Sequence, residues 1–142
     1  MAYTVGVFAT VFDDAGRVLL VRQAYGEQAW TQPGGGLEVG ETPIEGVLRE
    51  ILEETGCVAE VTAFIGTYVS VFRSDVVLHF EARVVEHGQR EPDDEIADLG
   101  FFIADDLPGH MRVHTRARVG DGLARRRNIL RTLTSVDVWS DF

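Results

Sequence analysis

Residues 35–57 read GGLEVGETPIEGVLREILEETGC and join a glycine-rich loop to a helix whose two ends are both marked. Thr42 stands at the N-cap position, followed by Pro43 at the first helical position, where a missing N–H costs nothing. Glu45, three residues after Thr42, completes a capping box. Gly56 supplies the left-handed residue at which helices commonly end. The stretch therefore predicts one helix that begins after Thr42 and ends before Gly56.

Apolar side chains recur through this helix at intervals of three and four residues, the period of a helix with one buried face. They are Ile44, Val47, Leu48, Ile51 and Leu52. The pattern predicts that these residues form one stripe packed against the core.

Three glutamates, Glu50, Glu53 and Glu54, fall together on another face of the same helix. Carboxylates at these spacings repel one another by about 0.2–0.5 kcal/mol for each pair in an isolated helix. Divalent cations would relieve this repulsion, and Mg²⁺ or Mn²⁺ would suit oxygen ligands. Taken alone, the three glutamates are more typical of the solvated face of an amphipathic helix, which is where most such glutamates lie. Gly46, one turn earlier on their face, leaves room for a loop or a ligand to approach.

As a motif, residues 35–57 resemble the Nudix box, G-x(5)-E-x(7)-R-E-U-x-E-E-x-G-U, in which U is an aliphatic residue. The matching positions are Gly35, Glu41, Arg49, Glu50, Ile51, Glu53, Glu54 and Gly56. Cys57 in the last aliphatic position is the single departure, and a buried free cysteine behaves as a small hydrophobic residue. Residues 30–35 and 101–108 also resemble the family's sequence on either side of the box, so the resemblance extends over most of the chain.

The resemblance implies an α/β/α sandwich with a mixed β-sheet between the helices. It also implies hydrolysis of a nucleoside diphosphate linked to another group, with Mg²⁺ or Mn²⁺ as cofactor. The metal ligands carried over are Glu50, Glu53 and Glu54, and either Glu50 or Glu53 is a candidate base for the attacking water. The backbone carbonyl of Gly34 or Gly35 would complete the metal site, as it does in relatives.

Two kinds of residue outside these ligands are similar to functional residues of the family. Glu41 and Arg49 resemble the pair that orients the acidic side chains toward the metal. Family members often recruit one more acid from a loop after the box, and Glu95 is the best-placed candidate here. Its competitors in that segment are Asp93, Asp94 and Asp98, and the segment would also suit a solvated acidic loop.

Three further residues are predicted to contact the substrate: Arg22, Gln32 and Glu38. Arg22 stands at the end of a predicted strand, where a guanidinium could bind a phosphoryl oxygen. An exposed strand-end arginine is an equally good reading. Glu38 either supports the metal ligands or is simply exposed.

The remaining elements follow from apolar alternation and from turn residues. Residues 4–12 and 17–22 predict a hairpin, and residues 58–71 and 76–85 predict a second one. Residues 24–40, rich in glycine, predict a loop without regular structure, and residues 99–103 a short strand. A second helix is expected over residues 114–133.

Composition limits the classes of protein to which the chain can belong. Its 142 residues fit a single domain, 1–142, with enough apolar content to bury a core. A net charge of −10 has the wrong sign for binding a long nucleic acid, whereas a small phosphorylated substrate such as a nucleotide is compatible if divalent cations reverse the local field. All thirteen basic residues are arginine, which excludes a lysine Schiff base and the lysine of a P-loop.

The sequence has no run long and apolar enough to span a membrane, and its N-terminus lacks the features of a signal peptide. Cys57 is the only cysteine, so no internal disulfide can form. We therefore expect a cytoplasmic protein without a membrane partner. Residues 136–142 could dock on the domain or across a homodimer.

Marks of particular Nudix substrates are absent outside the box. No proline lies between Pro43 and Pro92, where ADP-ribose hydrolases carry one, and Tyr68 falls several residues before the tyrosine of dinucleoside polyphosphate hydrolases. A nucleoside triphosphate or a nucleotide sugar is therefore the expected substrate. One alternative is a non-hydrolytic nucleotide sensor on the same fold, which would predict a damaged box. Another is an isopentenyl diphosphate isomerase, which needs a catalytic cysteine, whereas Cys57 stands at the exit of the helix.

Overall fold

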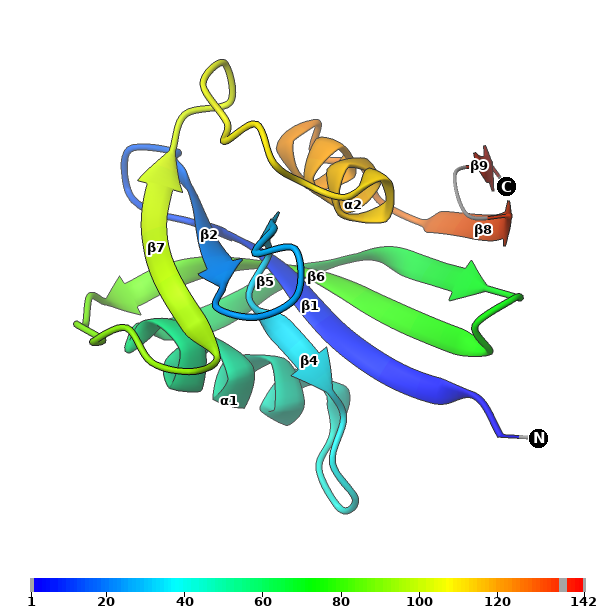
Figure 1. Ribbon diagram of the computed structural model, residues 1–142, viewed down its shortest axis with the longest axis horizontal. Coiled ribbons are helices and arrows are strands. Elements are labelled where there is room, and N and C mark those ends of the chain that lie inside the picture. The colour runs from blue at the N-terminus through cyan, green and yellow to red at the C-terminus, as the bar shows by residue number, and fades with distance from the viewer. Residues whose placement is uncertain (1, 136–137, 142) are drawn as a thin grey trace.

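The computed structural model describes residues 2–135 and 138–141 (Figure 1). Its elements in chain order are β1 Thr4–Phe12, β2 Val18–Gln23, β3 Trp30–Thr31, β4 Gly34–Gly36, α1 Pro43–Thr55, β5 Val58–Ser70, β6 Asp75–Glu86, β7 Ile96–Phe102, α2 Val113–Leu123, β8 Ile129–Ser135 and β9 Val138–Asp141. In this part of the chain, no helix is long and apolar enough to cross a membrane.

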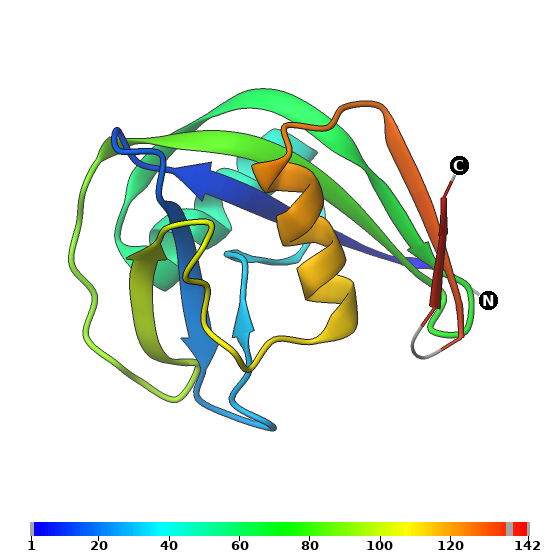
Figure 2. The same ribbon diagram turned by 90° about the horizontal axis from the view of Figure 1, so that it is seen from above.

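The strands form one mixed sheet with the order β3-β2-β1-β6-β5-β8-β9, to which β4 is added beside β1 and β7 beside β2. The pairs β1/β6 and β5/β8 are parallel, and the other pairs are antiparallel. Helix α1 covers one face of the sheet and α2 covers the other (Figures 1 and 2). This arrangement confirms the predicted α/β/α sandwich.

Helix α1 packs against the sheet through part of its apolar stripe. Val47 and Ile51 are fully buried against β1 and β6 residues, whereas Ile44 is 48% exposed and Leu52 is 52% exposed. The prediction of one continuous buried stripe is therefore wrong at its flanks. A helix touches a sheet along a narrow line, so residues at the margins of a broad stripe remain in solvent.

The predicted first hairpin is correct only at its turn. The Asp13 carboxylate accepts the backbone N–H groups of Ala15 (3.0 Å) and Arg17 (2.8 Å), which closes the turn. Beyond the single pair Phe12 and Val18 the two strands separate, because β1 pairs along its length with β6 and near its start with β4. Strand β2 pairs instead with β3 and β7.

The glycine-rich segment, expected to lack regular structure, contains strand β4. Gly34 pairs with Phe8 of β1, and a Cβ at position 34 would lie 2.4 Å from the Phe8 ring and from the Val7 carbonyl oxygen. Only glycine permits this approach, so the run of glycines allows a strand to form where composition suggested a loop.

The second helix is shorter than predicted. It ends at Leu123 rather than at residue 133, and residues 129–135 form β8, which pairs in parallel with β5. Arg125 and Asn128 have φ values of 55° and 59°, which interrupt the helix. Strand β7 begins at Ile96, three residues before the predicted start. Within the predicted C-terminal segment, the backbone of β9 pairs with β8, and residues 136, 137 and 142 lie outside the described part.

Candidate active site on the carboxylate face of α1

The start of α1 is fixed by the predicted capping box. Oγ1 of Thr42 accepts the N–H of Glu45 at 3.2 Å, and Oε1 of Glu45 accepts the N–H of Thr42 at 2.9 Å. Such a cap stabilises a helix by about 1 kcal/mol. Gly56 ends the helix in the left-handed conformation at φ 74°. The two caps therefore fix where the glutamate-bearing helix begins and where it ends.

Arg49 is the centre of an ion-pair cluster on this face. Its Nε and Nη2 bind the two oxygens of Glu41 at 3.0 and 2.7 Å, a two-pronged pairing that fixes both side chains. Its Nη1 lies 2.9 Å from Glu50 and 3.3 Å from Glu53. The pKa of Glu41 is lowered to about 2 by this pairing and by the N–H of Glu38. One guanidinium therefore orients several carboxylates.

The loop that carries Glu41 reaches the helix because of Gly46. A Cβ at position 46 would lie 2.8 Å from Leu37 and 2.9 Å from Glu41. The structure thus confirms that Gly46 makes room for a loop, and this approach brings Glu41 to Arg49.

A cavity of about 420 Å³ opens between α1, β4 and the start of β7. Its lining residues are Phe8, Gln23, Tyr25, Thr31, Gly34, Gly35, Glu50, Glu54, Glu95 and Ile96. Oε1 of Glu54 accepts the N–H of Gly34 at 2.8 Å, and a Cβ at Gly35 would lie 2.7 Å from Oε1 of Glu50. The backbone of strand β4 therefore lies directly against the two glutamates, and at position 35 the absence of a side chain leaves room for Glu50.

Two carboxylates of this cavity, those of Glu50 and Glu54, are destabilised as anions. Burial raises the pKa of Glu54 to about 8, and the charges of Glu50 and Glu95 act in the same direction against the N–H of Gly34. Burial also raises the pKa of Glu50, although Arg49 opposes the rise. A cation bound among these groups would lower their pKa values, because it stabilises the ionised forms.

Glu95 reaches the cavity because its loop is fastened to α1. Arg90 donates from Nε to the carbonyl oxygen of Glu53 at 2.7 Å and from Nη2 to Asp93 at 2.6 Å. Oδ1 of Asp93 then accepts the N–H groups of Glu95 (2.8 Å) and Ile96 (2.9 Å). A chain of hydrogen bonds thus runs from the end of the helix to the backbone of Glu95.

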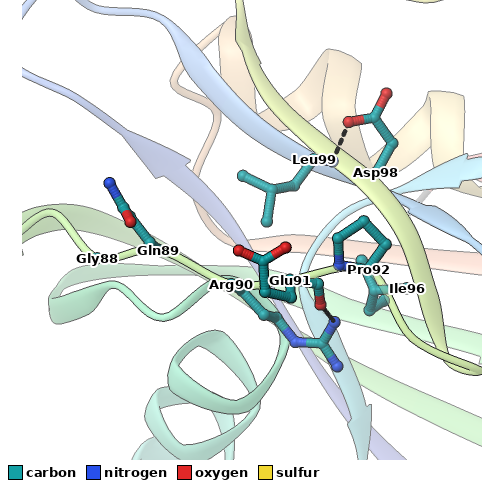
Figure 3. Close-up of a pocket in the computed structure, with 8 residues that line it drawn as sticks. All are labelled: Gly88, Gln89, Arg90, Glu91, Pro92, Ile96, Asp98 and Leu99. Atoms are coloured by element: carbon teal, nitrogen blue, oxygen red, sulfur yellow. Dashed lines mark hydrogen bonds between the residues drawn. The ribbon is translucent and has the colours of Figure 1, made fainter.

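The competing acids of this loop have other surroundings. Asp93 is engaged in the loop itself. Asp98 lines a neighbouring cavity of about 410 Å³, which the close-up in Figure 3 shows between residues 88–92 and the start of β7. One Asp98 oxygen accepts the N–H of Leu99, its neighbour in the chain. The two cavities share Ile96, but Glu95 is the acid of this loop that lines the cavity beside Glu50 and Glu54.

Besides Glu41 and Arg49, four predicted site residues lie outside the lining of the carboxylate cavity. Glu53 is 58% exposed and paired with Arg49, and Glu38 is exposed with an oxygen 3.6 Å from the same guanidinium. Arg22 donates to Gln28 at 2.9 Å. Gln32 is fully buried on the α2 side of the sheet, where it binds Thr10, His79 and Arg118.

The sequence did not single out Gln23, Phe8 and Thr31, which line the cavity. The pairing register of β2 shifts between Arg22 and Gln23. An irregularity of this kind changes which side chains face a given side of a sheet, so alternation along the strand could not identify Gln23. Tyr25, between β2 and β3, also lines the cavity.

The donor set of the cavity suits a hard divalent cation. The carboxylates of Glu50, Glu54 and Glu95 and the backbone carbonyls of Gly34 and Gly35 offer oxygen atoms, the ligands that Mg²⁺ and Mn²⁺ prefer. Within residues 2–135 and 138–141, no three His, Cys, Asp or Glu side chains are already grouped closely enough to hold an ion. The three glutamates would therefore have to close around a cation.

Comparison with known proteins gives one consistent result. The family model described as NUDIX domain matches residues 2–121. A MutT-like protein of Streptomyces ambofaciens is 33% identical over 121 residues, which cover 85% of this chain and 77% of that protein. A putative 8-oxo-dGTP diphosphatase of Bacillus subtilis is 34% identical over 121 residues, covering 84% and 79%. The crystal structure of a MutT NUDIX hydrolase from Burkholderia pseudomallei superimposes with a TM-score of 0.75 at 26% identity, covering 85% and 98%.

Proposed function

This chain belongs to the Nudix family and is a hydrolase of pyrophosphate linkages in nucleotide-linked substrates; from that premise we propose that it cleaves a nucleoside triphosphate or a nucleotide sugar and depends on Mg²⁺ or Mn²⁺. One observation carries the metal dependence. Three carboxylates line a single cavity, and burial raises the pKa values of two of them.

The metal would be held by Glu50, Glu54 and Glu95, with the backbone carbonyl of Gly34 or Gly35 completing the site. When bound, a divalent cation supplies positive charge to the phosphoryl oxygens and lowers the pKa of water. Glu53 points outward, and we retain it as a ligand that could join once the side chains rearrange. These assignments rest on the geometry of the cavity and on the match to the box.

Arg49 and Glu41 are proposed to act through Glu50. The two-pronged pairing holds the guanidinium in one orientation, and its Nη1 then fixes the Glu50 carboxylate at 2.9 Å. A carboxylate held in this way keeps one orientation, so that one of its oxygens can face the cavity. Glu50 is therefore our choice over Glu53 as the base for the attacking water, because Glu50 lines the cavity.

The choice of substrate rests on the cavity and on the relatives. The name of the Bacillus subtilis relative refers to a nucleoside triphosphate derivative, which favours this class. Tyr25 is exposed at the cavity and offers a face on which a base could stack. The net charge of −10 argues against long nucleic acids.

Hydrolysis of a nucleotide panel tests the proposal, with the nucleoside phosphates and the pyrophosphate, phosphate or sugar phosphate released from each substrate separated by chromatography. The panel contains nucleoside triphosphates including 8-oxo-dGTP, nucleotide sugars, ADP-ribose, a dinucleoside polyphosphate and an RNA with a 5′-triphosphate, each with Mg²⁺, with Mn²⁺ or with EDTA. We expect turnover of a triphosphate or a nucleotide sugar that stops in EDTA. Tight nucleotide binding without turnover under any condition would instead identify a non-hydrolytic sensor.

A further inference from the structure

A smaller compartment of about 110 Å³ adjoins the carboxylate cavity. The two share Phe8, Gln23 and Thr31 among their lining residues. The compartment is lined in part by residues from the first turns of α2. This helix covers the opposite face of the sheet from α1 (Figure 2). A ligand in the carboxylate cavity could therefore extend into it.

The compartment is lined by cations and by the uncapped start of a helix. Its remaining lining residues are Ala29, Trp30, Arg112, His114, Thr115 and Arg118, none of which is an acid. The first turn of α2 has no acidic residue, and its N-cap, Arg112, makes no capping hydrogen bond through its side chain. Free N–H groups and the positive end of the helix dipole therefore meet in this space.

Arg118 gives a second and independent reason to expect a ligand. Only 4% of its surface is exposed, and its Cζ lies 4.5 Å above the ring of Phe8. Its Nε donates to Gln32 at 3.1 Å, while its other N–H groups have no acceptor among the residues that the structure describes. Burial lowers the pKa of Arg118 to about 10, so the side chain is still a cation at neutral pH.

Carboxylates in this part of the fold do not neutralise Arg118. Asp121, one turn further along α2, accepts hydrogen bonds from Tyr68, Arg126 and Arg131. Asp75 favours the charged form of Arg118 only through its longer-range field. Among the described residues, Arg118 has no atom that is both buried and without a hydrogen-bond partner, so its remaining N–H groups are accessible, and an acceptor that enters the compartment lined by Arg118 could bind them.

We propose that this compartment binds an oxygen-rich, hydrogen-bond-accepting group of the substrate whose pyrophosphate lies in the carboxylate cavity. The inference rests on the proposed function and extends it to specificity. Two groups share the required chemistry: a phosphoryl group remote from the bond that is broken, and the carbonyl edge of a base. The charge of Arg118 favours the phosphoryl group, whereas Arg112 lies 3.6 Å from the carboxylate of Glu27.

Steady-state kinetics of Arg118→Lys and Arg118→Gln distinguish binding of a phosphoryl group from binding of a base carbonyl. The first pair of substrates is a nucleoside triphosphate and its diphosphate, and the second is ITP and ATP, which differ by a carbonyl or an amino group at position 6. If a phosphoryl group is bound, KM for the triphosphate rises about tenfold or more while kcat changes less than about threefold. The diphosphate is then unaffected. If a base carbonyl is bound, the preference between ITP and ATP is lost instead.

Two further measurements keep the test independent of folding and of turnover. Arg112→Gln changes a more exposed lining residue, and we expect a smaller shift of KM in the same direction. In EDTA, inorganic phosphate should raise the Tm of the wild type, because a ligand that binds only the folded state stabilises it. The rise should be smaller in the Arg118 variants and unchanged in Arg83→Gln, a control in an exposed ion pair with Glu60.

The inference is overturned if both substrate preferences survive in the Arg118 variants and phosphate leaves the Tm unchanged. Failure of the proposed function would look different, because no substrate would then be hydrolysed by the wild type while phosphate binding in EDTA could still be measured.

Discussion

The two charged clusters on opposite faces of the sheet have opposite compositions. At α1 one guanidinium, that of Arg49, is surrounded by carboxylates. At α2 one carboxylate, that of Asp121, is surrounded by donors: Arg126 at 2.7 Å, Arg131 at 2.8 Å and the hydroxyl of Tyr68 at 2.7 Å. The cluster at α1 has more carboxylates than guanidinium groups, and the cluster at α2 has more guanidinium groups than carboxylates.

Buried carboxylates in the two regions respond in opposite directions. Burial acts to raise the pKa of Asp121, but its hydrogen bonds to Arg131, Tyr68 and Arg126 outweigh burial and lower the pKa to about 2. Burial raises the pKa of Glu54 to about 8, and a single backbone N–H does not offset it. The α2 cluster is therefore complete within the fold, whereas the α1 cluster calls for a cation. We therefore expect the α2 cluster to contribute to stability and the carboxylates of α1 to contribute to metal binding.

The largest effect is expected for Glu54→Gln, which should separate activity from stability. We expect Mg²⁺-dependent turnover to fall about 1,000-fold, equivalent to about 4 kcal/mol, because a metal ligand is lost. Stability in urea at neutral pH should be unchanged or higher, because burial raises the pKa of Glu54 to about 8 and folding must therefore neutralise this carboxyl, whereas glutamine has no charge to lose. Glu60→Gln, in an exposed pair on β5, is the control. Wild-type turnover in Glu54→Gln would refute the assignment of this cavity.

Asp121→Asn should lower stability and leave activity nearly unchanged. The amide would place N–H groups against those of Arg126 or Arg131, so the free energy of unfolding should fall by about 3 kcal/mol in urea titrations. The specific activity of the folded fraction should remain close to that of the wild type. A variant as stable as the wild type would show that the α2 cluster is not a stabilising device.

A smaller effect should follow from Arg90→Ala, which removes the link between α1 and the loop of Glu95. We expect kcat to fall about tenfold and more metal to be needed for half-maximal activity, because Glu95 is no longer held at the cavity. Arg83→Ala is the matched control. In a Glu95→Gln background the same change should cost nothing further, and an additive loss would show that Arg90 acts elsewhere.

Near neutral pH the smallest effect concerns the pH dependence of stability on the α2 side, because it develops only below about pH 6.5. Burial lowers the pKa of His79 to about 3 and that of His114 to about 4, whereas unfolded histidine titrates near 6.5. Below about pH 6.5 the unfolded chain therefore binds more protons than the folded protein. Stability should decline from about pH 6.5 toward pH 4. Above about pH 6.5 these two histidines should not affect stability. Each histidine contributes at most about 1.4 kcal/mol per pH unit. Urea unfolding at several pH values should show a shallower slope for His79→Gln, and an unchanged slope would argue against a neutral buried imidazole.

Some features of the structure could be predicted from the sequence and others could not. The caps of α1 and the two long strands β5 and β6 follow from local patterns, and the structure confirms them. The end of α2 was missed because Arg125 and Asn128 adopt positive φ without a glycine to signal it. Gln32 stands beside the box in sequence and is predicted to contact the substrate; only the tertiary structure shows that its side chain is buried and bound to Thr10, His79 and Arg118.

The sequence by itself determined the helix, its acidic face and the family, because residues three or four apart on a helix must share a face and a capping box must begin one. Only the tertiary structure decided which acids meet. The loop after β6 brings Glu95 to Glu50 and Glu54, while Glu53, a neighbour of both in the same helix, points toward solvent and Arg49. The physical reason is that a helical period fixes directions within one element, whereas contacts between residues forty positions apart depend on strand lengths, glycine-permitted approaches and the hydrogen bonds that fasten a loop.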